Sequence, residues 1–440
     1  MNMLPALLLV VASGLVGVGI VVHPALALLP IVVGVAAAIA TRPFVLLLAF
    51  VAVLYLRPGD FSPALAALQP GKLFVVGALG VFAAQTLLAR RRQLVRSAND
   101  PWMLALTLAV LLSSLLSSDR AASVAVFKDV FLKILLLVFL MQNLLTSQRR
   151  VVAFQWTLGV LCGALGLYAV VMKATGNATI EGSRAALVGL LGDPNDLALI
   201  LLMPVHFLGF AAVRSRGPER WAGAILGACC VMGIVATLSR GGMLALAAGS
   251  YFSVRYFVKS RLFVVGGLAL GLAVFVVASG VAERKSGAVG AGEIDESAQG
   301  RLDAWKAGGR MVMRHPLLGV GLQRFADNFD AYSANPVFWG KHETHNSYIK
   351  AASETGLLGF IPFVVLVART LWSGWLLRRR AGAAATAAHE AVMGASFSNA
   401  VGFFAAAFFL SQCWGWFFYI LFALTDATHR TFGTSNGGAA

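Results

Sequence analysis

The stretch Val151–Met172 reads VVAFQWTLGVLCGALGLYAVVM and carries no charged side chain. An apolar run of about 18 or more residues can cross the ~30 Å hydrocarbon core of a bilayer as a helix. Three further runs of this kind occupy Met3–Val22, Trp221–Leu238 and Leu262–Ala282. Because a helix satisfies its backbone polar groups within one segment, these runs predict an all-α, polytopic transmembrane bundle.

The composition of the 440-residue chain agrees with a membrane protein. The chain is 59% hydrophobic and 12% charged, whereas soluble domains have roughly 45–50% apolar and about 25% charged residues. The net charge of +16 comes in short basic clusters between apolar runs. Such clusters are typical of cytoplasmic loops, so we expect no nucleic-acid partner. The four cysteines fall inside predicted spans and indicate no disulfide framework.

Twelve to fourteen spans are predicted. The first run lacks a basic N-terminal region, so it is expected to remain as the first helix. The candidate spans begin near Met3, Pro24, Phe44, Lys72, Trp102, Val124, Val151, Leu187, Trp221, Gly241, Leu262, Asn346, Ala391 and Trp414.

The basic clusters predict the orientation, since all of them fall on one side when the spans are counted in order. That side is cytoplasmic by the positive-inside rule, and both termini are expected there. The clusters are Arg42; Arg90, Arg91, Arg92 and Arg96; Arg149 and Arg150; Arg214, Arg216 and Arg220; Lys259 and Arg261; and Arg378, Arg379 and Arg380.

One long hydrophilic segment, Glu283–Glu343, is expected on the opposite, periplasmic side. It holds eight basic and eight acidic residues, and a loop of this length is usually functional. Within it, Gln299–Arg314 is predicted to be a helix that Pro316 ends, and no strand pattern is apparent. The predicted organisation is an N-terminal bundle (1–282), a periplasmic loop with short helices (283–345), C-terminal transmembrane helices (346–427) and a cytoplasmic tail (428–440).

This topology brings several polar residues to the periplasmic ends of spans. Ionisable groups close to the hydrocarbon are costly and usually have a partner or a function. A convergence of such groups therefore predicts a site on this side. The residues are Arg184, Asp193, Asn195, Asp196, Arg240, His342 and His345.

Two arginines are candidates for binding phosphate. Arg240 opens a short turn, Arg240-Gly241-Gly242, which holds its guanidinium near the bilayer face, where it suits a bidentate phosphate contact. Arg184 lies in a short loop on the same side. The alternative for each is an interfacial arginine that reaches toward lipid headgroups.

The sequence Asp193-Pro194-Asn195-Asp196 interrupts an apolar run. Proline breaks a helix, and broken helices at membrane depth line cavities. One interpretation is a polar wall of the site that orients Arg184 or Arg240. The other is a cap on the following helix.

His342 and His345 are at positions i and i+3 and can share a helical face. No third ligand at a suitable spacing supports a metal site. A neutral imidazole near pH 7 is a good general base. Hydrogen-bonded interfacial histidines are the alternative.

Together with further motifs, these residues resemble the O-antigen ligase and polymerase superfamily, and the N-terminal part is similar to the exosortase-associated O-glycosylation ligases. The His345–Gly356 separation matches a His-x10-Gly motif, and Arg240 with Leu244 matches Arg-x3-Leu. The resemblance covers roughly residues 180–375. The other matching segments are Arg301–Lys306, His315–Gly321, His345–Tyr348 and Glu354–Gly359.

The resemblance implies a membrane glycosyltransferase of the GT-C type in the bacterial inner membrane. His345 is then the catalytic base, and Arg240 and Arg184 hold the pyrophosphate of an undecaprenyl-diphosphate-linked glycan. The implied reaction inverts the anomeric centre without metal or other cofactor. The implied partners are this donor, a lipid A–core acceptor and membrane lipids. Supporting roles fall to His342, Asp193, Asn195, Asp196, Arg301, Asn346 and Tyr348.

Four functions remain open at this point. An O-antigen ligase transfers the glycan to lipid A–core in lipopolysaccharide biosynthesis, a polymerase to another lipid-linked repeat, and a protein O-oligosaccharyltransferase to a protein hydroxyl. The sequence ends soon after its last predicted span, which favours the first two. A lipid-linked glycan transporter would instead place ionisable residues near the bilayer midplane, whereas here they gather at one face.

Overall fold

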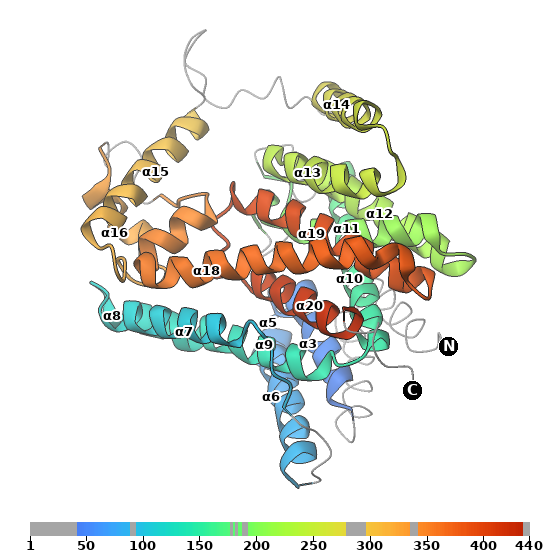
Figure 1. Ribbon diagram of the computed structural model, residues 1–440. Coiled ribbons are helices and arrows are strands. Elements are labelled where there is room, and N and C mark those ends of the chain that lie inside the picture. The colour runs from blue at the N-terminus through green and yellow to red at the C-terminus, as the bar shows by residue number, and fades with distance from the viewer. Residues whose placement is uncertain are drawn as a thin grey trace.

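The computed structural model describes residues 42–88, 94–176, 179–180, 184–186, 192–278, 296–334 and 342–433. This part of the chain is almost entirely helical, so the all-α prediction is confirmed (Figure 1). The spans predicted near Met3 and Pro24, the Gly- and Ala-rich start of the long loop and the end of the tail lie outside the described residues.

Every span predicted from Phe44 onward corresponds to a helix or a pair of joined helices. In chain order the elements are α3 (Pro43–Leu56), α4 (Pro58–Phe61), α5 (Pro63–Ala67), α6 (Pro70–Ala83), a π-helical turn (Ala84–Leu88), α7 (Asp100–Leu115), α8 (Arg120–Val126), a second π-helical turn (Phe127–Phe131), α9 (Leu132–Leu144), α10 (Gln148–Thr175), β1 (Thr179–Ile180), β2 (Arg184–Ala185), α11 (Pro194–Arg214), α12 (Pro218–Ala236), α13 (Arg240–Phe257), α14 (Arg261–Ala278), α15 (Glu296–Arg314), α16 (Phe325–Tyr332), α18 (Ser347–Arg380), a 3-10 turn (Ala381–Ala383), α19 (Ala387–Ala407) and α20 (Trp416–Phe432).

Six helical segments in the described ranges are long and apolar enough to cross a membrane. The 28 residues of α10, for example, rise by about 42 Å, which exceeds the ~30 Å hydrocarbon core. The chain is therefore a polytopic membrane protein, while the count of twelve to fourteen spans stays a prediction. The six segments are Pro43–Asp60, Pro63–Leu87, Gln148–Thr175, Pro194–Arg214, Pro218–Ala236 and Ser347–Ala383.

Helix α11 lies at the centre of one half of the bundle, where it packs against α10, α12, α13 and α19. Fifteen of its 21 residues are buried, as expected of a helix that is apolar around most of its circumference. Glycines allow α12 to approach closely: a Cβ on Gly233 would lie 2.6 Å from the Cα of Gly166 in α10. Small residues at such crossings are typical of membrane bundles.

Basic residues that the structure describes, among them Arg150, Arg214, Arg378 and Arg380, lie at one end of the bundle, which we call the basic end. Side chains there bind backbone or acidic groups of neighbouring helix ends, and this convergence agrees with the predicted common side. The contacts are Gln148 with the Thr431 carbonyl, Arg430 with the Gln142 carbonyl, Arg380 with the Gly433 carbonyl, and Arg214 with Glu390.

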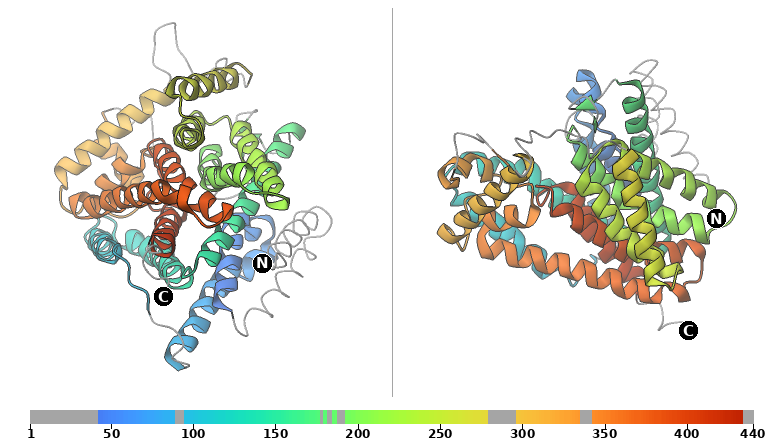
Figure 2. Two further views of the ribbon diagram at one scale, coloured as in Figure 1. Left: turned by 45° about the vertical axis from the view of Figure 1, so that its right-hand side comes forward. Right: turned by 90° about the horizontal axis from the view of Figure 1, so that it is seen from above.

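The opposite end, which we call the site end, holds the first residues of α11, α13, α18 and α20, because these helices run from there to the basic end. Beyond its non-helical residue Gly356, α18 continues to Arg380, and its residues 357–380 rise by about 36 Å. The two views of Figure 2 show the long helices of the bundle from other directions. The side of the membrane that each end faces remains a prediction.

The described part of the long loop is folded against the site end. The helix predicted at Gln299–Arg314 is confirmed as α15, which stops before Pro316. α15 packs on α16 and on α18, and all three lie together in Figure 1. Ala304, Ala307 and Met311 form a small separate core with Phe325 and Phe329 of α16.

A kink in α18 locks the loop to the bundle. Gly356 has φ 58° and ψ −165°, a non-helical conformation inside the element. The freed amides of Leu357 and Leu358 donate to the carbonyls of Pro316 (2.7 Å) and Leu317 (3.1 Å). A Cβ at Gly356 would lie 2.3 Å from the Leu317 carbonyl carbon. Two of the motif segments, His315–Gly321 and Glu354–Gly359, therefore interlock through backbone contacts.

Two small differences from the sequence predictions concern short elements. β1 and β2 form an antiparallel pair, with Ile180 opposite Arg184, which no pattern in the sequence predicts. Strands of two residues are too short to produce a period-two pattern. In addition, α20 extends to Phe432 and so includes the first residues assigned to the tail.

Candidate functional site

Arg184 of β2 is a buried brace at the site end. Its Nε donates to the Thr237 carbonyl (3.1 Å), and its Nη2 donates to Asn195 Oδ1 (2.9 Å). The same oxygen accepts the Ser239 hydroxyl at 2.7 Å. Hydrogen bonds to a charged group contribute more than neutral ones. Arg184 thus joins the start of α11 to the end of α12 and the turn before Arg240.

The Asp193–Asp196 segment performs both of the roles considered from the sequence. Asp193 caps α11, because its Oδ1 accepts the Asn195 backbone N–H at 2.7 Å, and Pro194 occupies the first helical turn. The same oxygen also accepts Asn195 Nδ2 at 2.9 Å, which turns the amide oxygen toward Arg184. Asp196 accepts Gln412 Nε2 at 2.8 Å. The segment therefore caps the helix and orients Arg184.

Arg240 is the first residue of α13 and is exposed. The preceding Ser239 caps this helix by accepting the Gly242 N–H at 3.1 Å. Gly241 packs closely on Phe409, since a Cβ there would lie 3.1 Å from the Phe409 Cβ. The start of α13 is thereby held beside the connection between α19 and α20.

That connection also holds His345. The His345 N–H donates to Ser411 Oγ at 2.8 Å, and the Ser411 hydroxyl contacts Thr344 Oγ1 at 2.9 Å. Trp305 of α15 donates to the Thr344 carbonyl at 3.0 Å. His345 adopts φ 46°, a left-handed conformation that costs on the order of 1–3 kcal/mol and persists only where the surroundings enforce it. The backbone that carries the imidazole is thus held in place.

The electrostatic surroundings keep the His345 imidazole neutral near pH 7. Burial lowers the pKa of His345 below its ordinary value, and the positive charges of Arg301 and His342 lower it further, against the opposing effects of Asp193 and Glu343. The rings of His342 and His345 lie 5.5 Å apart. Burial and Arg301 also lower the pKa of His342, while Glu343 raises it. A neutral imidazole is the form that accepts a proton.

These contacts bring the predicted residues into one cluster. Ser239, next to Arg240, shares Asn195 with Arg184, and Asn195 is bound to Asp193, which acts electrostatically on His345. Gln412, next to the residue that holds His345, binds Asp196. Arg301 joins from α15.

Asn346 and Tyr348 have structural roles in this arrangement. Asn346 is buried and caps α18 by accepting the N–H groups of Tyr348 (2.9 Å) and Ile349 (3.1 Å). The Tyr348 hydroxyl donates to the Phe404 carbonyl at 2.9 Å and so points toward α19. Their proximity to His345 in the sequence therefore reflects how α18 starts and packs.

Several residues of the site were not predicted. Ser411 and Gln412 carry no signal in the sequence, because only the tertiary fold brings them to His345 and Asp196. Lys350 and Glu354 do carry one: they are charged and four residues apart at the start of an apolar run, which suggests a buried pair. Lys350 also pairs with Glu343 at 2.7 Å.

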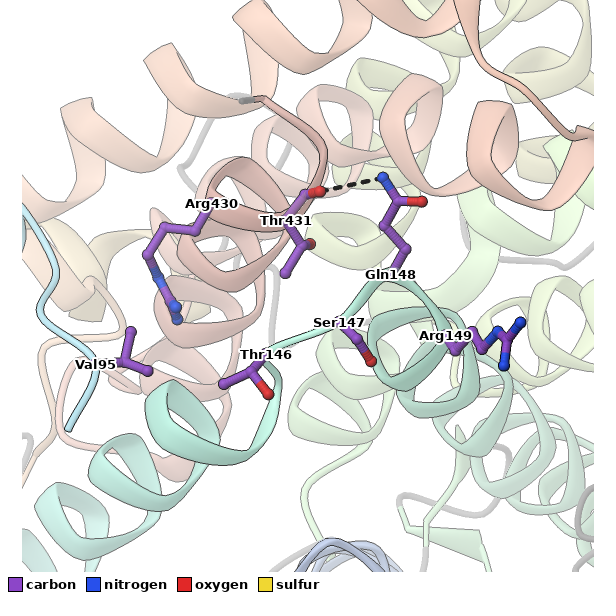
Figure 3. A pocket seen from close by; sticks show the side chains of 7 residues that line it. All are labelled: Val95, Thr146, Ser147, Gln148, Arg149, Arg430 and Thr431. Carbon is purple, nitrogen blue, oxygen red and sulfur yellow. Dashed lines mark hydrogen bonds between the residues drawn. The ribbon is translucent and has the colours of Figure 1, made fainter. Parts of the chain in front are cut away.

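A surface hollow of about 790 Å³ lies elsewhere, at the basic end. Figure 3 shows Gln148 in this hollow donating to the Thr431 carbonyl, beside Arg149 and Arg430. Its lining contains none of the predicted site residues. Within the described ranges, no three side chains of His, Cys, Asp or Glu are grouped as metal ligands.

The fold and this cluster define a class: a polytopic helical membrane protein with a polar, cationic site that contains a fixed imidazole at one end of the bundle. Residues 222–364 match the family model described as O-antigen ligase. The resemblance inferred from its motifs is thereby confirmed at the level of the superfamily. The matched range includes Arg240, Arg301 and His345, whereas Arg184 precedes it.

The chain is also similar to the exopolysaccharide production protein ExoQ of Rhizobium meliloti (strain 1021). The two are 26% identical over 257 residues, which cover 53% of this chain and 57% of that protein. The chain thus matches little more than half of the length of this curated relative.

Proposed function

We propose that this protein is an O-antigen ligase that transfers a glycan from undecaprenyl diphosphate to a hydroxyl of lipid A–core, on the periplasmic side of the inner membrane. The observation that carries the proposal is His345, whose backbone is anchored to Ser411 and whose imidazole has a lowered pKa. It shares one cluster with Arg301 and the start of α13. A hydroxyl acceptor needs a base, and a diphosphate leaving group needs cations more than it needs an acid.

In the proposed reaction, His345 takes the proton from the acceptor hydroxyl as its oxygen attacks the anomeric carbon. The bond between that carbon and the diphosphate oxygen breaks, and its electron pair leaves on the phosphate. Direct displacement inverts the anomeric centre. This scheme needs no metal ion or organic cofactor, because the base and the cations come from the chain.

Cations at the site end would stabilise the negative charge that develops on the leaving diphosphate. Arg240 is exposed at the first position of α13, where the helix dipole favours an anion. Arg301 of α15 supplies a further positive charge that acts on His345. Arg184 donates to the Thr237 carbonyl and to Asn195, so it would contribute to the diphosphate site through its charge and through the position that it gives to the turn before Arg240.

The test is a transfer assay with purified protein, lipid-linked glycan extracted from cells that lack the protein, and lipid A–core. The variant His345→Ala should abolish transfer and retain binding of the lipid-linked donor, because the imidazole acts on the acceptor. Arg240→Ala should instead weaken donor binding. Transfer by His345→Ala at the wild-type rate would refute the assignment of the base.

A polymerase is the second candidate, and the similarity to an exopolysaccharide production protein favours it. In this case the acceptor is the terminal sugar of another lipid-linked repeat, and the same base and cations serve. A deletion strain separates the two functions. Polymer that accumulates on its lipid carrier indicates a ligase, and single repeat units indicate a polymerase.

A further inference from the structure

Lys350 is a buried cation that the proposed reaction does not use. It lies in the first turn of α18, and its side chain is 3% exposed. Its Nζ lies 2.7 Å from Glu343 Oε2, 3.3 Å from Gln323 Oε1 and 3.9 Å from Glu354 Oε1. A buried ammonium is costly unless it is paired and hydrogen-bonded, so this position depends on its acidic partners.

Glu354 is the fixed partner of Lys350. Its side chain is fully buried. The carboxylate accepts the backbone N–H groups of Gln323 (2.9 Å) and Phe325 (3.1 Å) and the indole N–H of Trp414 (2.7 Å). These bonds tie α18 to the segment before α16 and to the connection before α20. Lys350 is thereby held between rigid elements.

Glu343 is the partner of Lys350 that lies next to the proposed base. It lies two residues before His345, and its side chain is 39% exposed. Each residue from Glu343 to His345 is held by a different element: Glu343 by Lys350 of α18, Thr344 by Trp305 of α15, and His345 by Ser411. Of these three contacts, the Glu343–Lys350 ion pair joins charged side chains, and it connects the segment before His345 to the buried Lys350–Glu354 pair.

We propose that the Lys350–Glu343 ion pair is a positioning device that fixes the segment before His345 so that the imidazole meets the acceptor hydroxyl. The inference rests on the proposed function, in which His345 is the base. Small misplacements of a catalytic group are costly: a shift of about 1 Å reduces rates by about 100-fold. Neither residue needs to touch substrate for this role.

Two substitutions at Glu343 distinguish the effect of its side-chain length from the effect of its charge. Glu343→Asp keeps the charge but shortens the side chain by one methylene, so it should lower kcat by about 10-fold with little change in the donor KM. Glu343→Gln removes the charge and should lower kcat by about 10- to 100-fold.

The pH profile of kcat/KM adds a readout that a purely structural role would not move. The charged groups that act on His345 are Arg301 from α15, Asp193 from the start of α11, and His342 and Glu343 from its own segment. Since Glu343 raises the pKa of His345, Glu343→Gln should shift the acid limb to lower pH. Glu343→Asp should leave that limb near the wild-type position.

Glu390→Gln is the matched control. Glu390 forms a 2.9 Å ion pair with Arg214 at the basic end, so its loss should affect stability without changing kcat or the pH profile. If both Glu343 variants keep wild-type kcat and pH profile and only lose stability, as the control does, the ion pair is merely structural and the inference fails. His345→Ala, measured in parallel, separates this result from failure of the proposed function, because it would then still abolish transfer.

Discussion

His345 depends on neighbours from four parts of the chain: α15, the start of α11, its own segment and the connection before α20. Burial and Arg301 lower its pKa. A base works only when it is deprotonated, so a lowered pKa extends activity toward acid. We therefore expect the transfer rate to persist below pH 6.5 and to fall as the pH drops through the lowered pKa of His345.

Removing the positive charge of Arg301 should raise the pKa of His345. The variant Arg301→Gln is thus expected to move the acid limb of kcat/KM to higher pH, measured as the initial rate of glycan transfer across pH 5 to 8. Lys306→Gln is the control, because Lys306 lies on the same helix, is well exposed and pairs with Asp303. An identical acid limb in wild type and Arg301→Gln would contradict the electrostatic assignment.

The variant Asn195→Ala should destabilise the site end. It removes the oxygen that accepts both Arg184 Nη2 and the Ser239 hydroxyl. Buried groups left without a partner cost about 1–3 kcal/mol each. We expect a lower melting temperature in detergent and weaker donor binding. Asn328→Ala, which removes a local bond within α16, should change neither by a comparable amount; equal effects of the two variants would argue against the brace.

The sequence predicts the main residues of the site better than the residues that hold them in place. The predicted topology depends only on apolar runs and basic clusters, and it already puts on one side of the bundle Arg184, Asn195, Asp193 and His345. The sequence does not predict Ser411 and Gln412 as site residues, because their contacts form only when the connection between α19 and α20 packs against the starts of α18 and α11.

The kink of α18 and the His315–Gly321 segment form one structural unit. Gly356, Gly319 and Gly321 all have positive φ, and a Cβ on any of them would meet neighbouring atoms within 2.4 Å or less. This unit joins the folded part of the long loop to the bundle. The motifs that carry the family resemblance thus serve the architecture around the site as well as its chemistry.

Gly356→Ala should disrupt this unit. A left-handed conformation with a side chain costs roughly 1–2 kcal/mol, and overpacking adds about 1–3 kcal/mol. We expect a loss of about 2–5 kcal/mol in stability, measured by thermal unfolding in detergent. Gly309→Ala in α15, where a Cβ would meet nothing within 4 Å, should instead gain about 0.5–1 kcal/mol. A wild-type melting temperature for Gly356→Ala would contradict the interlock.

The elements were predictable wherever the apolar run was long, as in α10 and α12, or where a proline marked the end, as in α15. The β1–β2 pair and the kink within α18 were not predictable, because each depends on contacts with distant residues. The motif spacing singles out Gly356 in the sequence, but it does not reveal that the next two amides bind the Pro316 and Leu317 carbonyls.

The whole molecule has two chemically different ends joined by long helices. At the basic end, arginines bind carbonyl and acidic groups, whereas the site end contains His345 and the helix caps around it. The folded part of the long loop, α15 and α16, lies beside one end of α18 (Figure 1). The part of α18 that follows Gly356 is about 36 Å long, which exceeds the ~30 Å hydrocarbon core, so the two ends are expected on opposite sides of the membrane.

Cysteine labelling tests this orientation in cells. In a variant without the four native cysteines, Met313→Cys in α15 should react with an impermeant maleimide from the periplasm, because Met313 is 75% exposed at the site end. Arg379→Cys, exposed at the basic end, should react only after the inner membrane is permeabilised. The reverse pattern would invert the predicted topology.

The central claim is that the cations and the imidazole of the site end form one receptor for a lipid-borne diphosphate. The most direct measurement is an electron cryomicroscopy map of the protein with undecaprenyl diphosphate. We predict density for the diphosphate against the Arg240 guanidinium, in the cluster that contains His345. Density at the basic end, or a diphosphate remote from both residues, would contradict the account.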